Sequence, residues 1–539
     1  MKRRYLSLFL ALTLMILALS ACGQQSEPQQ SQTSGAQASG TGTVNGGQKP
    51  VTLSIVTESF TPTIDCGEMP MWQELQKELN ITIKFDQVRS GWEERKAVIL
   101  ASNELPDIFL GGLTDGDIVT NSQAFVDMRA LIDQYAPNVK KMFEANPAAL
   151  AASSFPPDGA VYSLPLILGL MPESAEVMII NKTWLDKLNL EVPTTIDQLE
   201  TVLTAFRNGD PNENGKADEI PLDWPAEAYA HGHDIYCLTG AFGAVDNQSA
   251  DMPVVKNGKV DFLFTTDAFY KVTQYLHKWY KAGLINPEVY TNTYEQAGAL
   301  SNQGETARVG VTTGWSVESR AGKFADQYII LPQLSASANS AIKPLWPSNP
   351  SQFNAPNVCE LTTACKNPEA AMKLINMLYS DDYTLQNYYG SFPDNVTKHN
   401  DGTYTINAPA NGDTIEGNKW KNALVNYAPG NFSDELEARV NAPAELTGRL
   451  DQDNVYAGFR PKPEDIFPSV KFDAETTEKL VYLKTDLYKL VTQKMAQWCV
   501  KGGIESEWDS YLKDLDKMGL EEYRAIMQTA YDKVYKGGK

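Results

Sequence analysis

Stretches with strand periodicity alternate with stretches of helical periodicity early in this chain, and this alternation limits the available folds more than any other feature. Apolar residues recur at every second position in 51–57 and again in 81–85, as in strands with one buried face. Between them, residues 68–80 carry apolar side chains at helical spacing, and a helix over 92–104 precedes a short strand over 107–110. Strands that alternate with helices favour the α/β class, with parallel sheets and helices on both faces.

The alternation continues further along the chain. A strand over 177–180 is followed by a helix over 196–206, which Thr195 and Gln198 are placed to begin with a capping box. Later helices have apolar stripes of the same kind: Phe269, Val272, Leu276 and Trp279, and Leu480, Leu483, Leu487, Val491, Met495 and Trp498. The last seventy residues are expected to be helical, and the sequence contains no internal repeat.

The N-terminus has the features of an export signal. A basic start, Met-Lys-Arg-Arg, precedes an apolar run over 6–19, which is shorter than the roughly 20 residues of a membrane helix. Leu19-Ser20-Ala21-Cys22 then resembles the lipobox of bacterial lipoproteins, in which the cysteine becomes the lipidated N-terminus. We expect a signal peptide over 1–21 and a diacylglycerol with an acyl chain such as palmitate on Cys22. The alternative is an ordinary secretory signal that happens to contain a cysteine.

Residues 22–49 are expected to form the lipid anchor and a flexible linker. From residue 23 onward this segment has no aromatic residue and one β-branched aliphatic residue, Val44, so it cannot bury enough apolar surface to fold. A linker of this length and composition has a root-mean-square reach of about 30 Å.

The remaining chain is too long for one ordinary core, since the sequence has 539 residues, 42% of them hydrophobic. Two lobes are the simplest expectation. The net charge of −21 argues against nucleic acid as a partner. Apart from Cys22, five cysteines remain, an odd number that cannot all pair. Cys359 and Cys365 are close enough in sequence to bridge a short loop, but their spacing does not decide whether they do.

Several short segments, each weak by itself, occur together in a recognisable order. They are 101–102 (AS) with 105–108 (LPDI), 159–162 (GAVY) with 164–165 (LP), 181–206 (NKTWLDKLNLEVPTTIDQLETVLTAF), 280–287 (YKAGLINP), 366–371 (KNPEAA), and 508–512 (WDSYL) with 519–520 (GL). In this order, over nearly all of residues 50–535, the chain resembles the extracellular solute-binding proteins of the maltose-binding type, in their lipoprotein branch.

The resemblance implies a two-lobed periplasmic-binding-protein-like fold of type II, with the ligand cleft between the lobes and a helical C-terminal part. Lobe 1 is expected over 50–165 and 356–465, and lobe 2 over 166–355 and 466–539. The implied function is an ABC importer receptor that closes on an oligosaccharide and delivers it to membrane permease subunits. Such a receptor is expected to be a monomer, anchored by its lipid at the extracytoplasmic face of the cell membrane.

The most specific local motif is 210–219 (DPNENGKADE). Oxygen-bearing side chains at loop positions one, three, five and nine, with Gly215 at six, match an EF-hand calcium loop, although Pro221 replaces the glutamate of position twelve. The variant resembles the calcium site of alginate-binding relatives, which implies as Ca²⁺ ligands Asp210, Asn212, Asn214, Asp218, Glu219 and the Lys216 carbonyl. The alternative is a surface turn rich in Asn, Asp and Gly.

Sugar recognition requires flat apolar faces beside hydrogen-bonding groups. Trp315 lies after a strand-like segment, where relatives place a stacking aromatic residue. The further ligand-binding candidates are Trp224, Tyr229 and Tyr236 after the calcium loop, Trp346 between prolines, and Glu58, Phe60 and Trp92 near the first strands. For any single aromatic residue here, packing in a core is the competing explanation.

The sequence offers little support for an enzyme. It lacks a G-x-S-x-G elbow, a P-loop and a G-x-G-x-x-G motif, and His231 and His233 have no evident third metal ligand. An extracellular glycan hydrolase stays open as an alternative because carboxylates are abundant. A second alternative is a binding lipoprotein that reports to a sensor kinase or acts as an adhesin.

Overall fold

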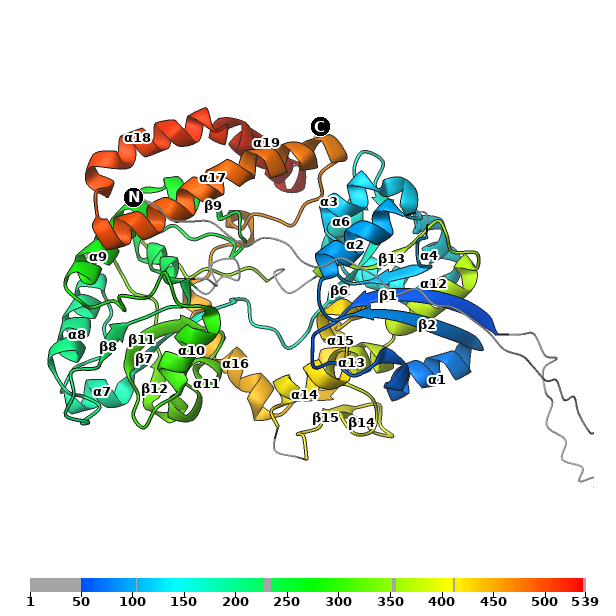
Figure 1. Ribbon diagram of the computed structural model, residues 1–539, viewed down its shortest axis with the longest axis horizontal. Helices are drawn as coiled ribbons and strands as arrows, with labels where there is room; N and C mark the ends of the chain where they lie inside the picture. Colours follow the sequence, from blue (N-terminus) through cyan, green and yellow to red (C-terminus); the bar gives the residue numbers. More distant parts are fainter. Residues whose placement is uncertain (1–49, 103, 227–233, 351–354, 411–412, 537–539) are drawn as a thin grey trace, which may run out of the picture. The chain divides into compact units, whose positions relative to one another are not determined.

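The computed structural model describes residues 50–102, 104–226, 234–350, 355–410 and 413–536 (Figure 1). Within these residues the chain forms two main sheets, each with its own hydrophobic core. The predicted signal peptide, Cys22 and the linker lie outside the described residues. None of the described helices is both long and apolar enough to span a membrane.

The first sheet has six strands, and its members come from distant parts of the chain. In spatial order they are β16 (Gly430–Asn431), β6 (Ser163–Ile167), β13 (Ala355–Leu361), β3 (Ile108–Leu110), β1 (Val51–Glu58) and β2 (Ile81–Val88). β1 pairs in parallel with both β2 and β3, so the strand–helix–strand unit expected at the start of the body is confirmed.

Both faces of this sheet are covered, although the alternating pattern in β1 by itself indicated one buried face. Leu53 and Ile55 pack in one core with α1 (Pro70–Leu79), whereas Val56 faces a second cluster with α2 (Trp92–Ala101). Figure 1 shows α1 and α2 on opposite sides of β1 and β2. Further helices in this part are α3 (Asp115–Thr120), α4 (Arg129–Tyr135), α5 (Pro137–Ala145), α6 (Pro147–Ser153), α12 (Pro368–Leu378) and α13 (Asp381–Tyr389).

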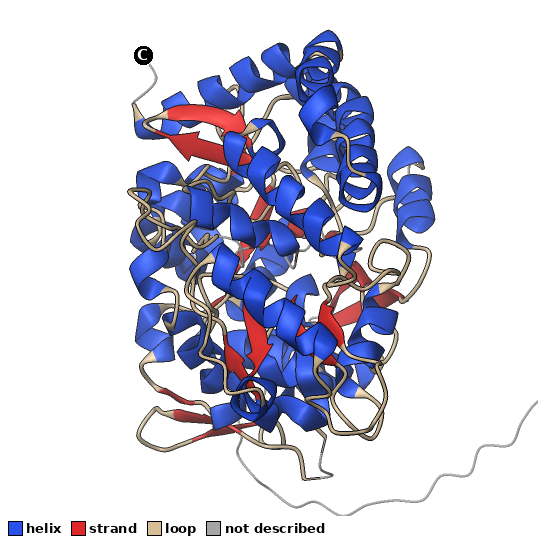
Figure 2. Ribbon diagram, turned by 90° about the vertical axis from the view of Figure 1, so that its left-hand side faces the viewer, coloured by secondary structure: helices blue, strands red, loops and turns tan. Residues whose placement is uncertain are grey.

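The second sheet has four strands and holds the largest core. Its spatial order is β12 (Tyr328–Ile330), β7 (Val177–Asn181), β11 (Val309–Gly314) and β8 (Ile220–Leu222). Surrounding helices are α7 (Lys182–Lys187), α8 (Ile196–Asn208), α9 (Asp267–Lys281), α10 (Tyr294–Asn302) and α11 (Val317–Ala321). Figure 2 shows helices packed around the strands of the described chain.

The expected parallel pairing holds for part of each sheet, and both sheets are mixed. β13 runs antiparallel to β3 and β6, and β7 runs antiparallel to β11 and β12. β13 does not arrive through a strand–helix–strand crossover from β6, because the whole second sheet is inserted between them in the sequence. Its direction is therefore not fixed by the handedness rule for such crossovers.

The C-terminal helices confirm the helical ending. They are α17 (Ala474–Lys501), α18 (Ile504–Lys517) and α19 (Leu520–Tyr535), and α17 and α18 both pack against α9 (Figure 1). Upstream, α14 (Ile415–Asn422), α15 (Asp434–Glu437) and α16 (Ala444–Asn454) lead towards them. Tyr456, just after α16, already belongs to the core of the second sheet. The lobe boundaries themselves stay a prediction.

The start of α8 differs in part from the predicted capping box. The Thr195 hydroxyl accepts the Gln198 backbone N–H at 3.2 Å, but the Gln198 side chain accepts from the Thr194 backbone N–H instead of from Thr195. The predicted capping box is thus half formed, because the neighbouring threonine competes for the Gln198 oxygen. Cys359 and Cys365 are both free thiols, as are the other three cysteines of the described chain.

Candidate ligand-binding site and calcium loop

The carboxyl ends of β1, β2 and β3 meet at one edge of the first sheet, because the three strands are parallel. Glu58, the last residue of β1, is half-buried, and burial followed by the nearby Glu93 raises the pKa of its carboxyl group, while Lys96 lowers it. Phe60 follows it and is 52% exposed. Such an edge is where open α/β sheets bind their ligands.

The Phe60 ring has an aromatic partner that the sequence did not reveal. Its centroid lies 5.3 Å from that of Trp420 on α14, with the planes tilted by 49°. The Trp420 indole N–H donates to Glu416 Oε1 at 2.8 Å, which restrains the ring, and Trp420 is half-exposed. The pair forms an accessible aromatic surface built from two segments that are 360 residues apart in the sequence.

Trp92 has a different environment. It is the first residue of α2, is 6% exposed and packs with Val56 and Phe109. Its indole N–H donates to the Gly112 carbonyl at 2.8 Å. A Cβ at Gly112 would lie 2.4 Å from the Trp92 ring, so the ring fills the space that the glycine leaves. Trp92 is therefore a core residue.

Trp315 follows β11 directly, at the end of that strand, and is half-buried. The guanidinium carbon of Arg449, from α16, lies 4.8 Å from the Trp315 ring centroid, within the range of a cation–π contact. Among the tryptophans predicted to bind ligand, Trp315 alone is not buried in the described structure.

The other predicted aromatic residues of the second sheet pack in its core. Trp224 is 2% exposed and meets Tyr290 edge-on at 5.8 Å, and Tyr236 stacks on Phe269 at 4.8 Å. Trp346 is 1% exposed and stacks on Tyr456, with ring centroids 3.8 Å apart. Their burial leaves no ring face for a ligand, because side chains from distant parts of the sequence cover them. Tyr229, like His231 and His233, lies outside the described residues.

The 210–219 loop follows α8 and is organised around its own oxygen atoms. Asp210 accepts the backbone N–H groups of Asn214 (3.2 Å) and Gly215 (2.9 Å). The side-chain amides of Asn212 and Asn214 donate to Asp218 Oδ1 at 3.2 and 2.9 Å. Gly215 has φ +71°, a left-handed conformation that glycine adopts without strain. These contacts bring the predicted ligands together around one turn.

The pKa values of two carboxyl groups in this loop are shifted in opposite directions. Burial raises the pKa of Glu219, and the neighbouring Asp210 and Asp218 raise it further, although its own backbone N–H lowers it. Burial also disfavours the charged form of Asp218, but the amide donors of Asn214 and Asn212 outweigh it, so the pKa of Asp218 is lowered. Glu219 Oε1 is buried without a hydrogen-bond partner among the described residues. An orphaned carboxylate oxygen beside two acidic residues is what a cation would satisfy.

Within the described chain, no three His, Cys, Asp or Glu side chains are arranged so that they could hold a metal ion. A calcium ion here would depend equally on the Asn212 and Asn214 amide oxygens and on the Lys216 carbonyl, which are neutral oxygen ligands that Ca²⁺ accepts. The residues present therefore fit a calcium loop of mixed ligands, and do not fit an all-carboxylate transition-metal site.

Sequence reasoning missed Trp420, Arg449 and Asp453. Trp420 belongs to a short polar helix whose pattern gives no sign of a ligand contact, and α16 has the composition of a solvated helix. Arg449 and Asp453, four residues apart, are one helical turn from each other, which could have suggested a local pair. That both are almost fully buried could not have been seen, because the covering residues are remote in sequence.

Comparison with known proteins agrees with this architecture. The model of the family described as bacterial extracellular solute-binding protein matches residues 68–385. A relative in Streptococcus pneumoniae serotype 4, the fructooligosaccharide ABC transporter substrate-binding protein FusA, is 31% identical over 505 residues, covering 90% of this chain and 91% of the relative.

Two solved structures are similar over the same length. An HMO-binding, ABC-transporter-associated solute-binding protein of Bifidobacterium longum infantis is 30% identical, with a TM-score of 0.84, covering 90% of this chain and 99% of that one. The Streptococcus pneumoniae FusA EF-hand mutant in complex with fructo-nystose is 28% identical, with a TM-score of 0.80, covering 90% and 100%. The fold is thus that of a two-domain binding protein. The chain belongs to the family of bacterial extracellular solute-binding proteins.

Proposed function

We propose that this chain is the extracytoplasmic receptor of an ABC importer and captures an oligosaccharide by closing two lobes around it. The observation that carries the proposal is the accessible aromatic surface near the strand ends of each sheet, formed by the exposed Phe60 with the half-buried Trp420 and by the half-buried Trp315. Family membership supports the same ligand class, as does the similarity to FusA, a fructooligosaccharide ABC transporter substrate-binding protein.

The physical reason lies in the ligand. A sugar ring has an apolar face that stacks on an aromatic ring, while its hydroxyl groups need hydrogen-bond partners. Phe60 and Trp420 supply a platform beside the Glu58 carboxyl group, and Trp315 supplies a second ring from the other sheet. Two platforms on separate sheets suit a ligand of several sugar units.

The binding experiment is a thermal-shift screen with nystose as the first probe, beside neutral and uronic oligosaccharides. A ligand at 100 times its dissociation constant stabilises the native state by about 2.7 kcal/mol, which raises the melting temperature. Trp315→Ala should weaken nystose binding by roughly 10–100-fold, the effect of removing a central aromatic contact. The matched control is Tyr482→Ala, since Tyr482 is 79% exposed on α17 and is no part of the proposed site.

Two outcomes of this screen would contradict the proposal. If no oligosaccharide raises the melting temperature, the receptor proposal is wrong. If Trp315→Ala lowers stability but leaves the nystose affinity of the folded chain unchanged, Trp315 is a packing residue. The receptor should also return nystose intact, whereas a glycan hydrolase would release new reducing ends.

The calcium loop belongs to the same proposal. We infer that Asp210, Asn212, Asn214, Asp218, Glu219 and the Lys216 carbonyl hold a structural Ca²⁺. The orphaned Glu219 Oε1 supports this assignment, as does the similarity to a relative whose solved structure is described as an EF-hand mutant. The ion would neutralise the loop's carboxylates, and the chain's own residues order the turn around it.

The anchor is proposed from the sequence of the N-terminus. Lipidation at Cys22 would hold a monomeric receptor at the outer face of the cell membrane, within reach of its permease. Cys22→Ala is expected to leave the protein shed into the medium or kept as an uncleaved precursor. Fractionation of cells that express each form measures this. Processed Cys22→Ala protein that stays in the membrane fraction would refute the lipid anchor.

A further inference from the structure

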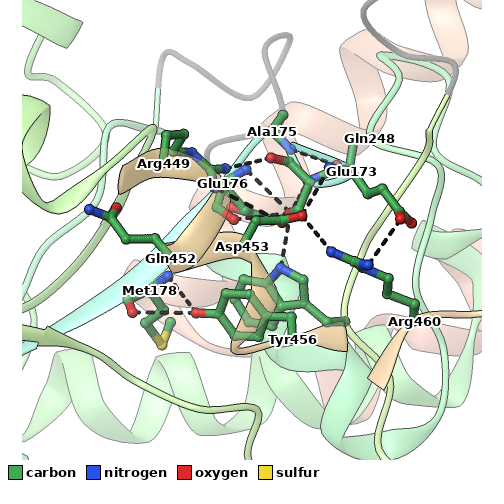
Figure 3. Close-up of polar contacts among 12 residues, drawn as sticks. Glu173, Ala175, Glu176, Met178, Gln248, Arg449, Gln452, Asp453, Tyr456 and Arg460 are labelled. Atoms are coloured by element: carbon green, nitrogen blue, oxygen red, sulfur yellow. Dashed lines mark hydrogen bonds and ion pairs between the residues drawn. The ribbon is translucent and has the colours of Figure 1, made fainter. Parts of the chain in front are cut away.

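Three segments that are far apart in sequence meet in one polar network beside Trp315. Figure 3 shows its centre, where Asp453 Oδ2 accepts the Glu173 backbone N–H at 2.9 Å and an Arg460 N–H at 2.6 Å. Arg460 also donates to Glu173 Oε1 at 2.9 Å. Nearby, the Trp346 indole N–H donates to the Ser174 hydroxyl at 2.9 Å, which brings in the third segment. Asp453 therefore takes its hydrogen bonds from Arg460 and the Glu173 backbone, and Arg449 adds only an ion pair at 3.9 Å.

Arg449 links this network to the half-buried Trp315 ring. One of its terminal N–H groups donates to the Ser174 carbonyl at 2.5 Å, while its guanidinium lies 4.8 Å from the Trp315 centroid. Arg449 is 5% exposed and Trp315 is half-buried. The guanidinium therefore covers the inner side of the ring, and the accessible part of Trp315 is left to a ligand.

The remaining nitrogen atoms of Arg449 show what fixes its position. Nε and Nη1 are buried and find no hydrogen-bond acceptor among the described residues, and Nη1 lies 3.9 Å from Asp453 Oδ1, beyond hydrogen-bond distance. The Ser174 carbonyl and the Trp315 ring are thus its close partners. A guanidinium held in this way restrains the ring it stacks on, because a planar cation over an aromatic face favours one orientation.

We propose that Arg449 is a positioning residue, which holds the Trp315 ring in the orientation that stacks on the bound sugar. The inference rests on the proposed function, since it takes Trp315 as a sugar platform. Arg449 acts through Trp315 and need not touch the ligand. Because the buried Arg449 guanidinium covers one face of the half-buried Trp315 ring, a ligand can stack on the other face alone.

The test compares Arg449→Met with a matched variant, Arg460→Met. Both remove a guanidinium from the same Asp453 network, but Arg449 is the one that stacks on Trp315. With nystose as the probe, Arg449→Met should weaken binding about tenfold, as expected for loss of a ring-orienting cation–π contact. Arg460→Met should lower the melting temperature and change the nystose affinity by less than about threefold. Arg449→Lys, which can keep a cation near the ring, should restore part of the affinity.

Two further measurements separate positioning from a general loss of stability. The near-ultraviolet circular dichroism of Trp315, obtained as the difference between each chain and its Trp315→Phe counterpart without ligand, should change in Arg449→Met and stay unchanged in Arg460→Met. In the double variant Trp315→Ala/Arg449→Met, nystose binding should be no weaker than in Trp315→Ala alone, because residues that act as one unit are not additive.

The inference is overturned if the Trp315 signal is the same in Arg449→Met and the parent chain, or if the losses of affinity in the double variant simply add. If Trp315→Ala binds nystose as the parent does, the proposed platform fails. The ligand-free spectrum then still decides whether Arg449 orients the ring. Equal losses of affinity in Arg449→Met and Arg460→Met would show that both residues support the surrounding fold and that Arg449 has no special role in positioning Trp315.

Discussion

Glu360 is a carboxyl group buried within the six-stranded sheet, on β13, and it is fully inaccessible to solvent. The Ser163 hydroxyl donates to its Oε1 at 2.5 Å, while Oε2 finds no partner among the described residues. Burial raises the pKa of Glu360 to about 8, although Ser163 and the ammonium of Lys471 lower it; Asp117 raises it slightly further. At neutral pH the group is largely protonated in the native chain.

Stability should therefore depend on pH through this residue. Between about pH 4.5 and 8 the native state keeps a proton that the unfolded chain has lost, so the free energy of unfolding falls as pH rises. Glu360→Gln, which imitates the protonated form, removes this loss. We expect denaturant unfolding to show that, from pH 5 to pH 9, the free energy of unfolding of Glu360→Gln rises by a few kcal/mol relative to that of the parent chain. The size follows because one pKa unit corresponds to about 1.4 kcal/mol.

Glu435→Gln is the control for this prediction. Glu435 is an exposed carboxylate whose pKa is lowered by its partner Lys141, so its removal should not reproduce the effect. Parallel pH profiles of the parent chain and Glu360→Gln would show that Glu360 is ionised in the native state.

Aromatic residues show the limit of sequence reasoning at this scale. Trp92, Trp224, Trp315 and Trp346 all occur near turns or strand ends, and nothing in their local sequence separates them. Three of the four are buried, because the residues that cover them, such as Tyr456 over Trp346, come from remote segments. Exposure of a single side chain is a tertiary property.

At the scale of elements, the 210–219 loop should gain its order from calcium. Chelation with EDTA should lower the melting temperature of the chain from residue 50 onward by several degrees, because the carboxylates of Asp210, Asp218 and Glu219 repel one another without a cation. Asp210→Ala should remove this dependence. Calorimetry of the chain with and without EDTA measures both effects.

Glu213 provides a control within the same loop. Its Oε2 atom lies 2.8 Å from Lys187 Nζ, and Glu213 is not one of the predicted calcium ligands. Glu213→Ala should therefore keep the response to EDTA. Identical melting curves of the parent chain with and without EDTA would leave the loop as an Asx-rich surface turn.

The sequence was most informative about individual strands and helices. β1, β2 and the helices α1, α8, α9 and α17 occur where periodicity predicted them, because the 2.0- and 3.6-residue repeats follow from local backbone geometry. Strand direction was not accessible in this way. β7 is as apolar as a buried parallel strand, and the antiparallel pairing of both β7 and β13 depends on the side from which the chain enters each sheet.

At the scale of the whole molecule, capture by lobe closure predicts compaction. Small-angle scattering of the chain from residue 50 onward should give a smaller radius of gyration with saturating nystose than without it, because closure brings both lobes onto the sugar. Trp315→Ala at the same nystose concentration should keep the radius of the free chain. Bound nystose with an unchanged radius in the parent chain would refute the closure mechanism.

The sequence by itself determined the order of strands and helices, the family resemblance and the composition of the candidate calcium loop, since each depends on residues that are neighbours along the chain. The tertiary structure decided which aromatic rings are accessible, paired Phe60 with Trp420, and set Arg449 behind Trp315. These contacts join residues that are more than a hundred positions apart in the sequence. They form only when burial of the two cores fixes where those distant segments meet, and no local pattern records that outcome.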